Sequence, residues 1–268
     1  MQTILRNLTL SAVLLTSALA HAATASGTTS AWTNGIGLVS GTSNWTFSSG
    51  LNEIAAAFRT DVYIQAPAIV TQMYEYDPVF EIDVLKDTQV LTPLSAFTFD
   101  TSSKQLATIR TTGGVLLQTP ALAGVSYGGS FAIQNMAIDL SNKRVYASIT
   151  GNFTGVASHG AGVAGGAVTT IDNFYLWDFA SLSGSSILQG SPSFTAEKLR
   201  LTTSGLDHIA SALRLYATGR AALTSINDTG YGLITTTLVV TVPEPSTYAL
   251  ALAGIALVAV TRRRRTAH

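Results

Sequence analysis

Hydrophobic residues form one long run at each end of the chain and short alternating runs between them. Residues 8–20 are an apolar run behind the basic residue Arg6. Residues 249–260 are Ala, Leu, Ile and Val with one Gly, and four arginines follow almost at once. In between, apolar and polar positions alternate with a period of two, which is typical of half-buried β-strands. The pattern predicts two terminal targeting segments around a β-rich body.

The predicted strands are stretches of β-branched and aromatic residues bounded by turn formers. They cover residues 79–85, 94–99, 106–111, 115–118, 130–140, 143–150, 168–179, 196–203 and 233–242. This spacing favours a mainly β fold, built as an antiparallel sandwich or a barrel-like sheet.

Two of these strands carry more detailed predictions. The inward face of residues 130–140 changes from odd to even positions near Gln134-Asn135, which predicts a β-bulge in a hairpin with residues 143–150. In residues 171–179 the odd positions are expected to anchor an aromatic core, with two aspartates on the other face. Those odd positions are Ile171, Tyr175, Trp177 and Phe179.

One amphipathic helix is predicted at about residues 204–217. Apolar residues recur there at helical spacing, Ser204 and Asp207 resemble a capping box, and Gly219 ends the pattern. We expect this helix to close one end of the sheet.

The N-terminal run predicts export. Residues 1–22 have a positive start, an apolar helix and a small-x-small cleavage site at Ala20 and Ala22, so they form a secretory signal peptide. The exported chain then divides into a Ser/Thr/Gly-rich leader at residues 23–60, whose order is open, and a β-rich domain at residues 61–241.

The C-terminal run predicts a transmembrane helix. Residues 246–261 span about 24 Å as a helix, a marginal length for a hydrocarbon core of about 30 Å. The arginines after it stay on the cytoplasmic side because each guanidinium costs about 2.5–3.5 kcal/mol at mid-membrane. They are Arg262, Arg263, Arg264 and Arg265. The body is therefore expected to be anchored in the inner membrane and to face away from the cytoplasm.

A rigid motif precedes this helix. Pro243 and Pro245 fix their own φ angles and hold Glu244 extended at the outer membrane interface. Pro243, Glu244, Pro245 and Ser246, followed by a Gly-containing apolar helix and an arginine cluster, resemble the PEP-CTERM sorting domain over residues 242–265. The resemblance implies recognition by an exosortase, a membrane-embedded processing enzyme of Gram-negative bacteria that make exopolysaccharide and biofilm matrix. A plain tail anchor with a fortuitous Pro-Glu-Pro is the alternative.

The amino-acid composition excludes several classes of function for the body. Without Arg6, Glu244 and the arginine cluster, the body has ten basic and fourteen acidic residues, a net charge of about −4, so it is not expected to bind nucleic acid. Cysteine is absent, which excludes disulfides, thiolate metal sites and a Cys nucleophile. Charged residues are 11% of the chain, so Ser, Thr, Asn and Gly must cover much of the surface.

Motifs for chemistry are weak. His159 and His208 show no metal-ligand spacing, and we expect a loop histidine and a helix-surface histidine. Residues 160–165 match Gly-x-Gly-x-x-Gly, but no strand precedes them and no helix pattern follows, so a loop is the better interpretation. No metal or cofactor is predicted.

Two surface features leave alternatives open. Glu81 and Asp83 lie on one face of a predicted strand and form a candidate calcium site or carboxylate pair, although a solvated outer face is the simpler interpretation. Tyr74 and Tyr76, beside Pro78, form a candidate sugar-stacking surface, although packing of an edge strand is commoner.

A fainter resemblance concerns residues 129–146 and 199–230. Their strand and helix rhythm, including Ser204-Gly205-Leu206, is similar to HtaA-like surface domains, some of which bind haem. No haem ligand is carried over because no matching His or Tyr motif is found.

The sequence thus predicts an exported, non-enzymatic protein of the cell surface or of an exopolysaccharide-containing matrix, processed by an exosortase. A surface module that binds haem or carbohydrate and a secreted hydrolase are the alternatives.

Overall fold

The computed structural model describes residues 22–26, 36–78, 81–153, 167–189 and 191–241. Within them the chain forms twelve strands and three short helices. The strands are β1 (Ala22–Ser26), β2 (Gly37–Phe47), β3 (Asp61–Gln65), β4 (Ile69–Asp77), β5 (Ile82–Asp100), β6 (Leu106–Thr111), β7 (Gly114–Leu122), β8 (Ser126–Asp139), β9 (Arg144–Gly151), β10 (Thr169–Gly184), β11 (Ser193–Leu201) and β12 (Gly232–Thr241). The helices are α1 (Ser49–Ala57), α2 (Thr203–Ala212) and α3 (Ala217–Ser225).

All described strands belong to one antiparallel sheet with the order β1-β5-β2-β12-β11-β10-β9-β8-β7-β3. The short strand β6 pairs with β5 on one side and with β8 on the other, so the hydrogen-bonded path closes on itself. The mainly β, antiparallel prediction is therefore confirmed, and the closed path corresponds to its barrel-like alternative.

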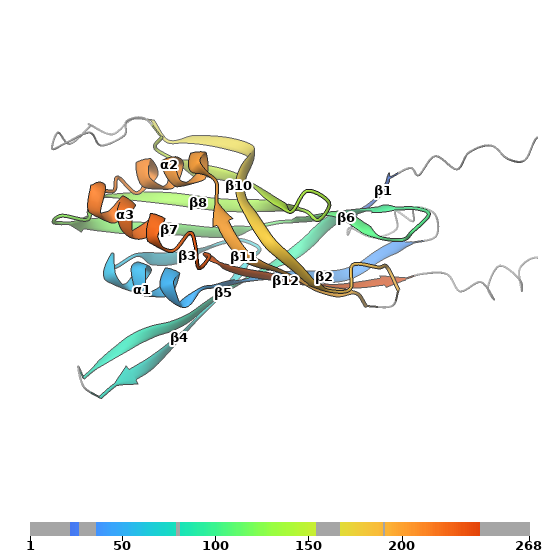
Figure 1. Cartoon of the computed structure of the whole chain (residues 1–268), viewed down its shortest axis with the longest axis horizontal. Coiled ribbons are helices and arrows are strands. Elements are labelled where there is room, and N and C mark those ends of the chain that lie inside the picture. The colour runs from blue at the N-terminus through green and yellow to red at the C-terminus, as the bar shows by residue number, and fades with distance from the viewer. Residues whose placement is uncertain (1–21, 27–35, 79–80, 154–166, 190, 242–268) are drawn as a thin grey trace, which may run out of the picture.

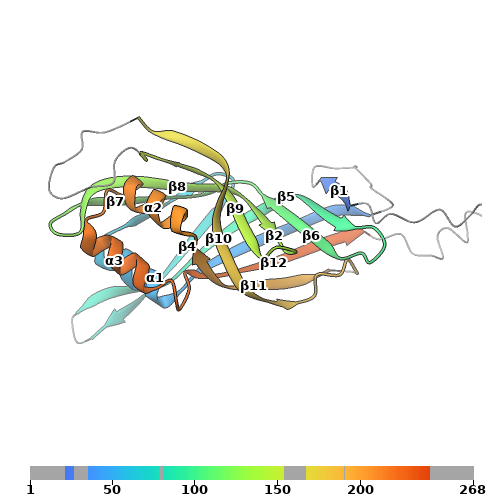
Figure 2. The same ribbon diagram turned by 45° about the horizontal axis from the view of Figure 1, so that its top comes forward.

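The molecule is elongated, with different features at its two ends (Figure 1). The three helices gather at one end, and the hairpin of β4 with the first half of β5 projects beside them (Figures 1 and 2). The last strand, β12, ends at the opposite end, where Thr241 pairs with Gly37 at the start of β2. Both described ends of the chain thus lie away from the helices.

The core fills the inside of the closed sheet. Its largest fully buried side chains are Trp177, Phe97, Phe99, Phe131 and Phe194, together with several isoleucines and leucines. Alternation along β12 shows the cause: Ile234, Leu238 and the hydroxyl of Thr236 face inward, while Thr237 and Val239 face out.

Several strand predictions are confirmed. The sequence places β6 at the bounds that the structure has, and β8 pairs with β9 as the predicted hairpin. The predicted bulge is present, because the register shifts between Gln134 and Ala137 and Asn135 has a φ of 51°.

The prediction of one helix at residues 204–217 is wrong in number and bounds. α2 begins earlier, because the Thr202 hydroxyl rather than Ser204 caps it by accepting from the Gly205 N–H at 2.9 Å. It ends at Ala212, and Gly219 lies inside α3 rather than at a helix end. Asp207 forms an ion pair with Arg220 instead of completing a capping box.

The predicted core face of β10 is right at Trp177 and Phe179 but wrong at Tyr175. The pairing with β9 shifts between Ile171 and Phe174 and again between Tyr175 and Trp177, and Asn173 has a φ of 52°. Tyr175 therefore lies on the surface, where its hydroxyl donates to Asp178 and Arg144 stacks over its ring.

Residues 37–58 are part of the folded body, so the predicted start of the β-rich domain at residue 61 is too late. β2 lies between β5 and β12, and Trp45, Phe47 and Phe58 belong to the core. In the part of the chain that the structure describes, no helix is long and apolar enough to cross a membrane. Of the predicted signal peptide, residues 1–22, all but Ala22 lie outside the described residues, and so does the predicted C-terminal helix.

Candidate ligand site beneath the helices

A cavity of about 50 Å³ lies where the three helices meet the inner face of the sheet. Side chains from β2, β7, β8, β10 and all three helices line it. Nearly all of these side chains are apolar, and those that carry a polar atom, such as Trp45, Trp177 and Tyr231, contribute mainly their apolar surface. The cavity is therefore an apolar space with very few hydrogen-bonding groups.

The residues that line the cavity differ in how far they are exposed to solvent. Trp45 and Trp177 are 2% and 1% exposed and form the floor. Leu51, Ile54, Thr60 and Leu117 are only half-buried. These half-buried residues are the part of the lining nearest to solvent.

Helix α1 contributes Leu51, Ile54 and Ala55 to the lining of the cavity, and its local sequence determines where the helix begins. The Ser48 hydroxyl accepts from the Leu51 N–H at 3.2 Å, which is an N-cap. A Cβ on Gly50 would lie 2.9 Å from Ile226 Cγ2, so glycine lets α1 approach the end of α3 closely.

Two tryptophans meet at the floor with unsatisfied donors. The rings of Trp45 and Trp177 are 5.0 Å apart at 59° to each other, and Trp45 also packs on Phe47 at 4.4 Å. Each indole Nε1 is buried and has no hydrogen-bond partner among the described residues. A buried unmade hydrogen bond costs about 1–3 kcal/mol, so two unpaired indole donors are an unusual feature of this core.

Tyr231 is the other polar group deep in the wall. Its hydroxyl donates to the Leu223 carbonyl at 2.6 Å, which connects the start of β12 to α3. Burial raises the pKa of this phenol well above its usual value, so the group stays protonated and its donor is used.

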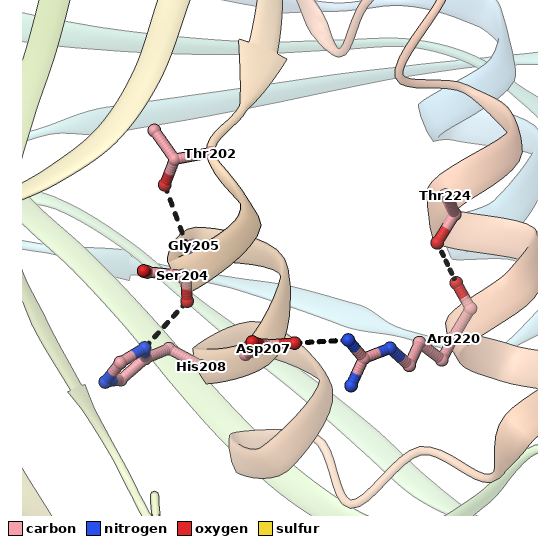
Figure 3. Close-up of polar contacts among 7 residues, drawn as sticks. All are labelled: Thr202, Ser204, Gly205, Asp207, His208, Arg220 and Thr224. Carbon is pink, nitrogen blue, oxygen red and sulfur yellow. Dashed lines mark hydrogen bonds and ion pairs between the residues drawn. The ribbon is translucent and has the colours of Figure 1, made fainter.

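Figure 3 shows the polar contacts of helices α2 and α3, of which the ion pair joins one helix to the other. Thr202 caps α2, Arg220 of α3 pairs with Asp207 of α2, and the Thr224 hydroxyl donates to the Arg220 carbonyl at 2.9 Å. The ion pair is partly exposed, so it contributes at most about 1 kcal/mol to stability.

His208 is a packing residue on the helix surface, as predicted. Its Nδ1 lies 2.7 Å from the Ser204 carbonyl and therefore carries the hydrogen of that bond (Figure 3). The ring packs between Phe153 at 4.8 Å and Phe174 at 4.7 Å. His159 and the glycine-rich residues 160–165 lie outside the described residues.

The acidic residues of the β4–β5 hairpin do not converge. Glu81 and Asp83 are exposed, and Glu75 pairs with Lys86 across the hairpin at 3.3 Å. Asp87 accepts from Gln89 at 2.6 Å. Within the described ranges, no three Asp, Glu, His or Cys side chains come close enough to hold a metal ion.

Tyr74 and Tyr76 lie on β4, which among the described strands pairs with β5 alone. They are 58% and 59% exposed, so they are not used for core packing. The surface is thus open to contact, and its role in sugar stacking stays a prediction.

The sorting residues predicted from the sequence, from Pro243 to Arg265, lie outside the described residues, and so does Ala20. Ala22 is the first residue of β1, which pairs with β5. The family model for the PEP-CTERM protein-sorting motif matches residues 241–265. This chain carries a PEP-CTERM sorting motif. The match starts at Thr241, the residue at which β12 ends.

The structure is also similar to solved domains from Corynebacterium glutamicum. The heme binding protein HtaB aligns at 13% identity and a TM-score of 0.41 over 75% of this chain and 92% of that one. The N-terminal domain of HtaA aligns at 13% identity and a TM-score of 0.43 over 77% and 99%. The resemblance to HtaA-like domains is thus present in the structure, at similarities too low to assign a function. No curated protein matches the chain.

The cavity itself was not predicted from the sequence. Trp45 belongs to the Ser/Thr/Gly-rich leader, whose order the sequence leaves open. Trp177 is predicted to lie in the core, but the sequence does not indicate that it packs against Trp45. Trp45 and Phe47 in a Ser/Thr-rich segment, just before the Ser-Ser-Gly helix start at residues 48–50, are the signal that points to a buried strand running into a capped helix.

Proposed function

We propose that this protein is an exported surface or extracellular protein that an exosortase processes at its C-terminal signal, with no catalytic activity of its own. The observation that carries the proposal is the PEP-CTERM match at residues 241–265. Hydropathy and charge support it independently, because residues 246–261 and the arginines after them have the order of a membrane helix and a cytoplasmic stop.

The position of the motif relative to the fold supports processing. The motif begins where β12 ends, at the end of the sheet far from the helices (Figure 1). Cleavage beyond Thr241 would leave every described pair of β12 with β2 and β11 intact. The body would keep its fold after release, with the cavity and the β4 hairpin at the end away from the membrane.

A non-catalytic body agrees with the chemistry of the described residues. The secreted-hydrolase alternative needs two carboxylates that share a site. Glu81 and Asp83 instead lie exposed on a projecting hairpin. We therefore favour display or binding at the cell surface over hydrolysis as the function of the body. The surroundings of such a protein can include exopolysaccharide.

Ligand binding is the second candidate, and the cavity is the observation that favours it. Haem does not fit this cavity: its lining holds no His, Cys or Met, and the Tyr231 hydroxyl is bonded to a backbone carbonyl. A cavity of about 50 Å³ is also smaller than the roughly 150 Å³ that takes one benzene. Carbohydrate at Tyr74 and Tyr76 is left as a prediction.

Replacement of the tripeptide tests the proposal. The variant Pro243→Ala/Glu244→Ala/Pro245→Ala should stay in the inner membrane with its tail uncut, while the wild type reaches the surface or the medium. Thr247→Ala, in the same segment but outside the tripeptide, is the matched control and should behave as the wild type. Cell fractionation with an antibody to the body gives the readout. Identical distribution of the triple variant and the wild type would contradict the proposal.

A further inference from the structure

We infer that the free edge of β4 pairs with the same edge of a second copy of this chain, antiparallel and centred on Met73, so that two β4–β5 hairpins join into one four-stranded sheet. A two-fold contact of this kind uses the same surface on both copies. The contact goes beyond the proposed function and does not depend on the sorting signal, so either can fail without the other.

The edge of β4 lacks a partner strand. β4 is nine residues long and, among the described strands, pairs with β5 alone. The other strands with a single described partner, β1 and β3, have five residues each. In an antiparallel strand every second residue directs its N–H and C=O away from the neighbouring strand. β4 therefore presents a row of backbone donors and acceptors that another extended strand fits.

The composition of β4 does not protect this edge. Natural edge strands are commonly blocked by lysine or proline. β4 contains neither, and the nearest prolines, Pro67 and Pro78, lie outside it. Four of its large side chains are instead more than half exposed: Ile69, Met73, Tyr74 and Tyr76. The hairpin also projects from the body (Figures 1 and 2), and because an isolated two-stranded hairpin is marginally stable, additional strands would stabilise it.

The other strand of the hairpin, β5, is less available to a partner. The Asn52 side chain of α1 donates to the Lys86 carbonyl at 3.2 Å, and Asn52 is only 2% exposed. Charged residues also follow one another along this part of β5, at Asp83, Lys86 and Asp87. The edge of β4 is therefore the one that a partner strand would use.

The sequence of β4 is complementary to itself in one register. A two-fold pairing centred on Met73 pairs all nine residues, because Ile69 then lies opposite Asp77 of the second copy. Glu75 lies opposite Thr71, so no like charges face each other, whereas a centre at Glu75 would place two glutamates opposite each other. The pairing would form about eight to ten backbone hydrogen bonds, which is the number in a typical protein–protein interface.

The exposed tyrosines also find partners in this register. Tyr76 lies opposite Val70 of the second copy, and Tyr74 lies opposite Gln72 on the same face of the sheet. Cross-strand pairs of an aromatic and a β-branched residue stabilise antiparallel sheets. The apolar side chains that β4 exposes in one copy are thus covered in the pair.

Introduced thiols test the register, because the chain has no cysteine. In the full chain in detergent, Met73→Cys places two thiols directly opposite each other, with Cα atoms about 4.5–5.5 Å apart, so mild oxidation should join the copies by a disulfide. Thr71→Cys, on the same face of the same strand, places its two thiols roughly 13 Å apart along the strands and should not cross-link. Mixed Thr71→Cys and Glu75→Cys chains should cross-link with each other. Non-reducing gel electrophoresis gives the readout.

A charge at the centre of the contact should separate the copies. Met73→Lys places two ammonium groups opposite each other and should raise the dissociation constant of the pair at least about tenfold, while Met73→Leu should leave it unchanged. Met73 is 53% exposed, so both variants should fold, which circular dichroism checks, and analytical ultracentrifugation measures the mass. Any of three results would overturn the inference: Met73→Cys stays monomeric on oxidation, Thr71→Cys cross-links as fast, or Met73→Lys sediments as the wild type does.

Discussion

Uncharged polar residues and single carboxylates stabilise the turns and helix starts of this protein. Charged residues are only 11% of the chain, so few ion pairs can take this role. Hydroxyl groups do most of this: Ser48 and Thr202 cap helices, and Ser43 bonds Thr236 inside the sheet at 3.0 Å. Asp100 ends β5 by accepting four hydrogen bonds from the two serines that follow in the turn. Each of these groups makes a local prediction.

Asp100 should titrate at an unusually low pH. The hydrogen bonds from Ser102 and Ser103, the Ser102 hydroxyl first, lower its pKa from 3.8 to about 2. Because the folded pKa lies below the unfolded one, the stabilisation from these bonds is present above about pH 4 and is lost as the pH falls through 2. NMR titration of the carboxyl carbon should show this midpoint.

Ser102→Ala should raise the midpoint of Asp100 toward 3.8, and Ser225→Ala, on α3 at the other end of the molecule, should not move it. A midpoint near 3.8 in the wild type would show that the turn does not hold the carboxylate.

Thr202 should contribute more to the free energy of unfolding than its exposed neighbours on α2. Its hydroxyl accepts from the Gly205 N–H at 2.9 Å (Figure 3). It also donates to the Tyr175 carbonyl at 3.1 Å, so it joins α2 to β10. Thr202→Ala should lower the free energy of unfolding by about 1–2 kcal/mol in urea melts. Thr202→Ser keeps the oxygen and should cost less than half as much; equal losses would assign the effect to packing of the methyl group.

At the scale of elements, the helices dock where the sheet offers backbone rather than side chains. Gly129 on β8 and Gly151 on β9 lie under the C-terminal end of α2. A Cβ on Gly129 would lie 2.2 Å from the Ala212 carbonyl oxygen, and one on Gly151 would lie 2.6 Å from Ala212 Cβ. The cavity depends on this close docking, because Ile209 and Leu213 of the same helix segment line it.

The two glycines should respond differently to a change at Ala212. Gly151→Ala should destabilise the protein by about 1–3 kcal/mol through overpacking, and Ala212→Gly should recover at least about 1 kcal/mol of that loss in the double variant. Gly129→Ala crowds a backbone oxygen, so the same second change should recover nothing. Equal coupling energies for both pairs, measured by urea unfolding, would contradict this docking geometry.

The elements that could be predicted from the sequence are those in which apolar and polar residues alternate within the element itself. β6, β8, β9 and β12 alternate clearly, and the bulge at Gln134 leaves a visible change of face. β2 was missed because its inward face includes Ser43, whose buried hydroxyl is satisfied only by Thr236 of a strand 193 residues away. α3 was missed because it is nine residues long and has no side-chain cap. The cavity needs all three helices, so no local pattern could reveal it.

At the scale of the whole molecule, the fold places the helices and the start of the sorting motif at opposite ends. The chain enters and leaves the described sheet at one end, where Gly37 pairs with Thr241 and the sorting motif begins. The helices, the cavity and the β4 hairpin lie at the other end (Figure 1). This arrangement suits a body that is presented away from the membrane and then released, which is the central claim of the proposed function.

The most direct test is the mass of the protein recovered from the medium and from the inner membrane of strains with and without exosortase activity. The account predicts a species in the medium that starts near Ala23 and lacks the region from Tyr248 to His268, formed only when the exosortase is present. An intact tail in the membrane of both strains would mean a plain anchor and would contradict the account.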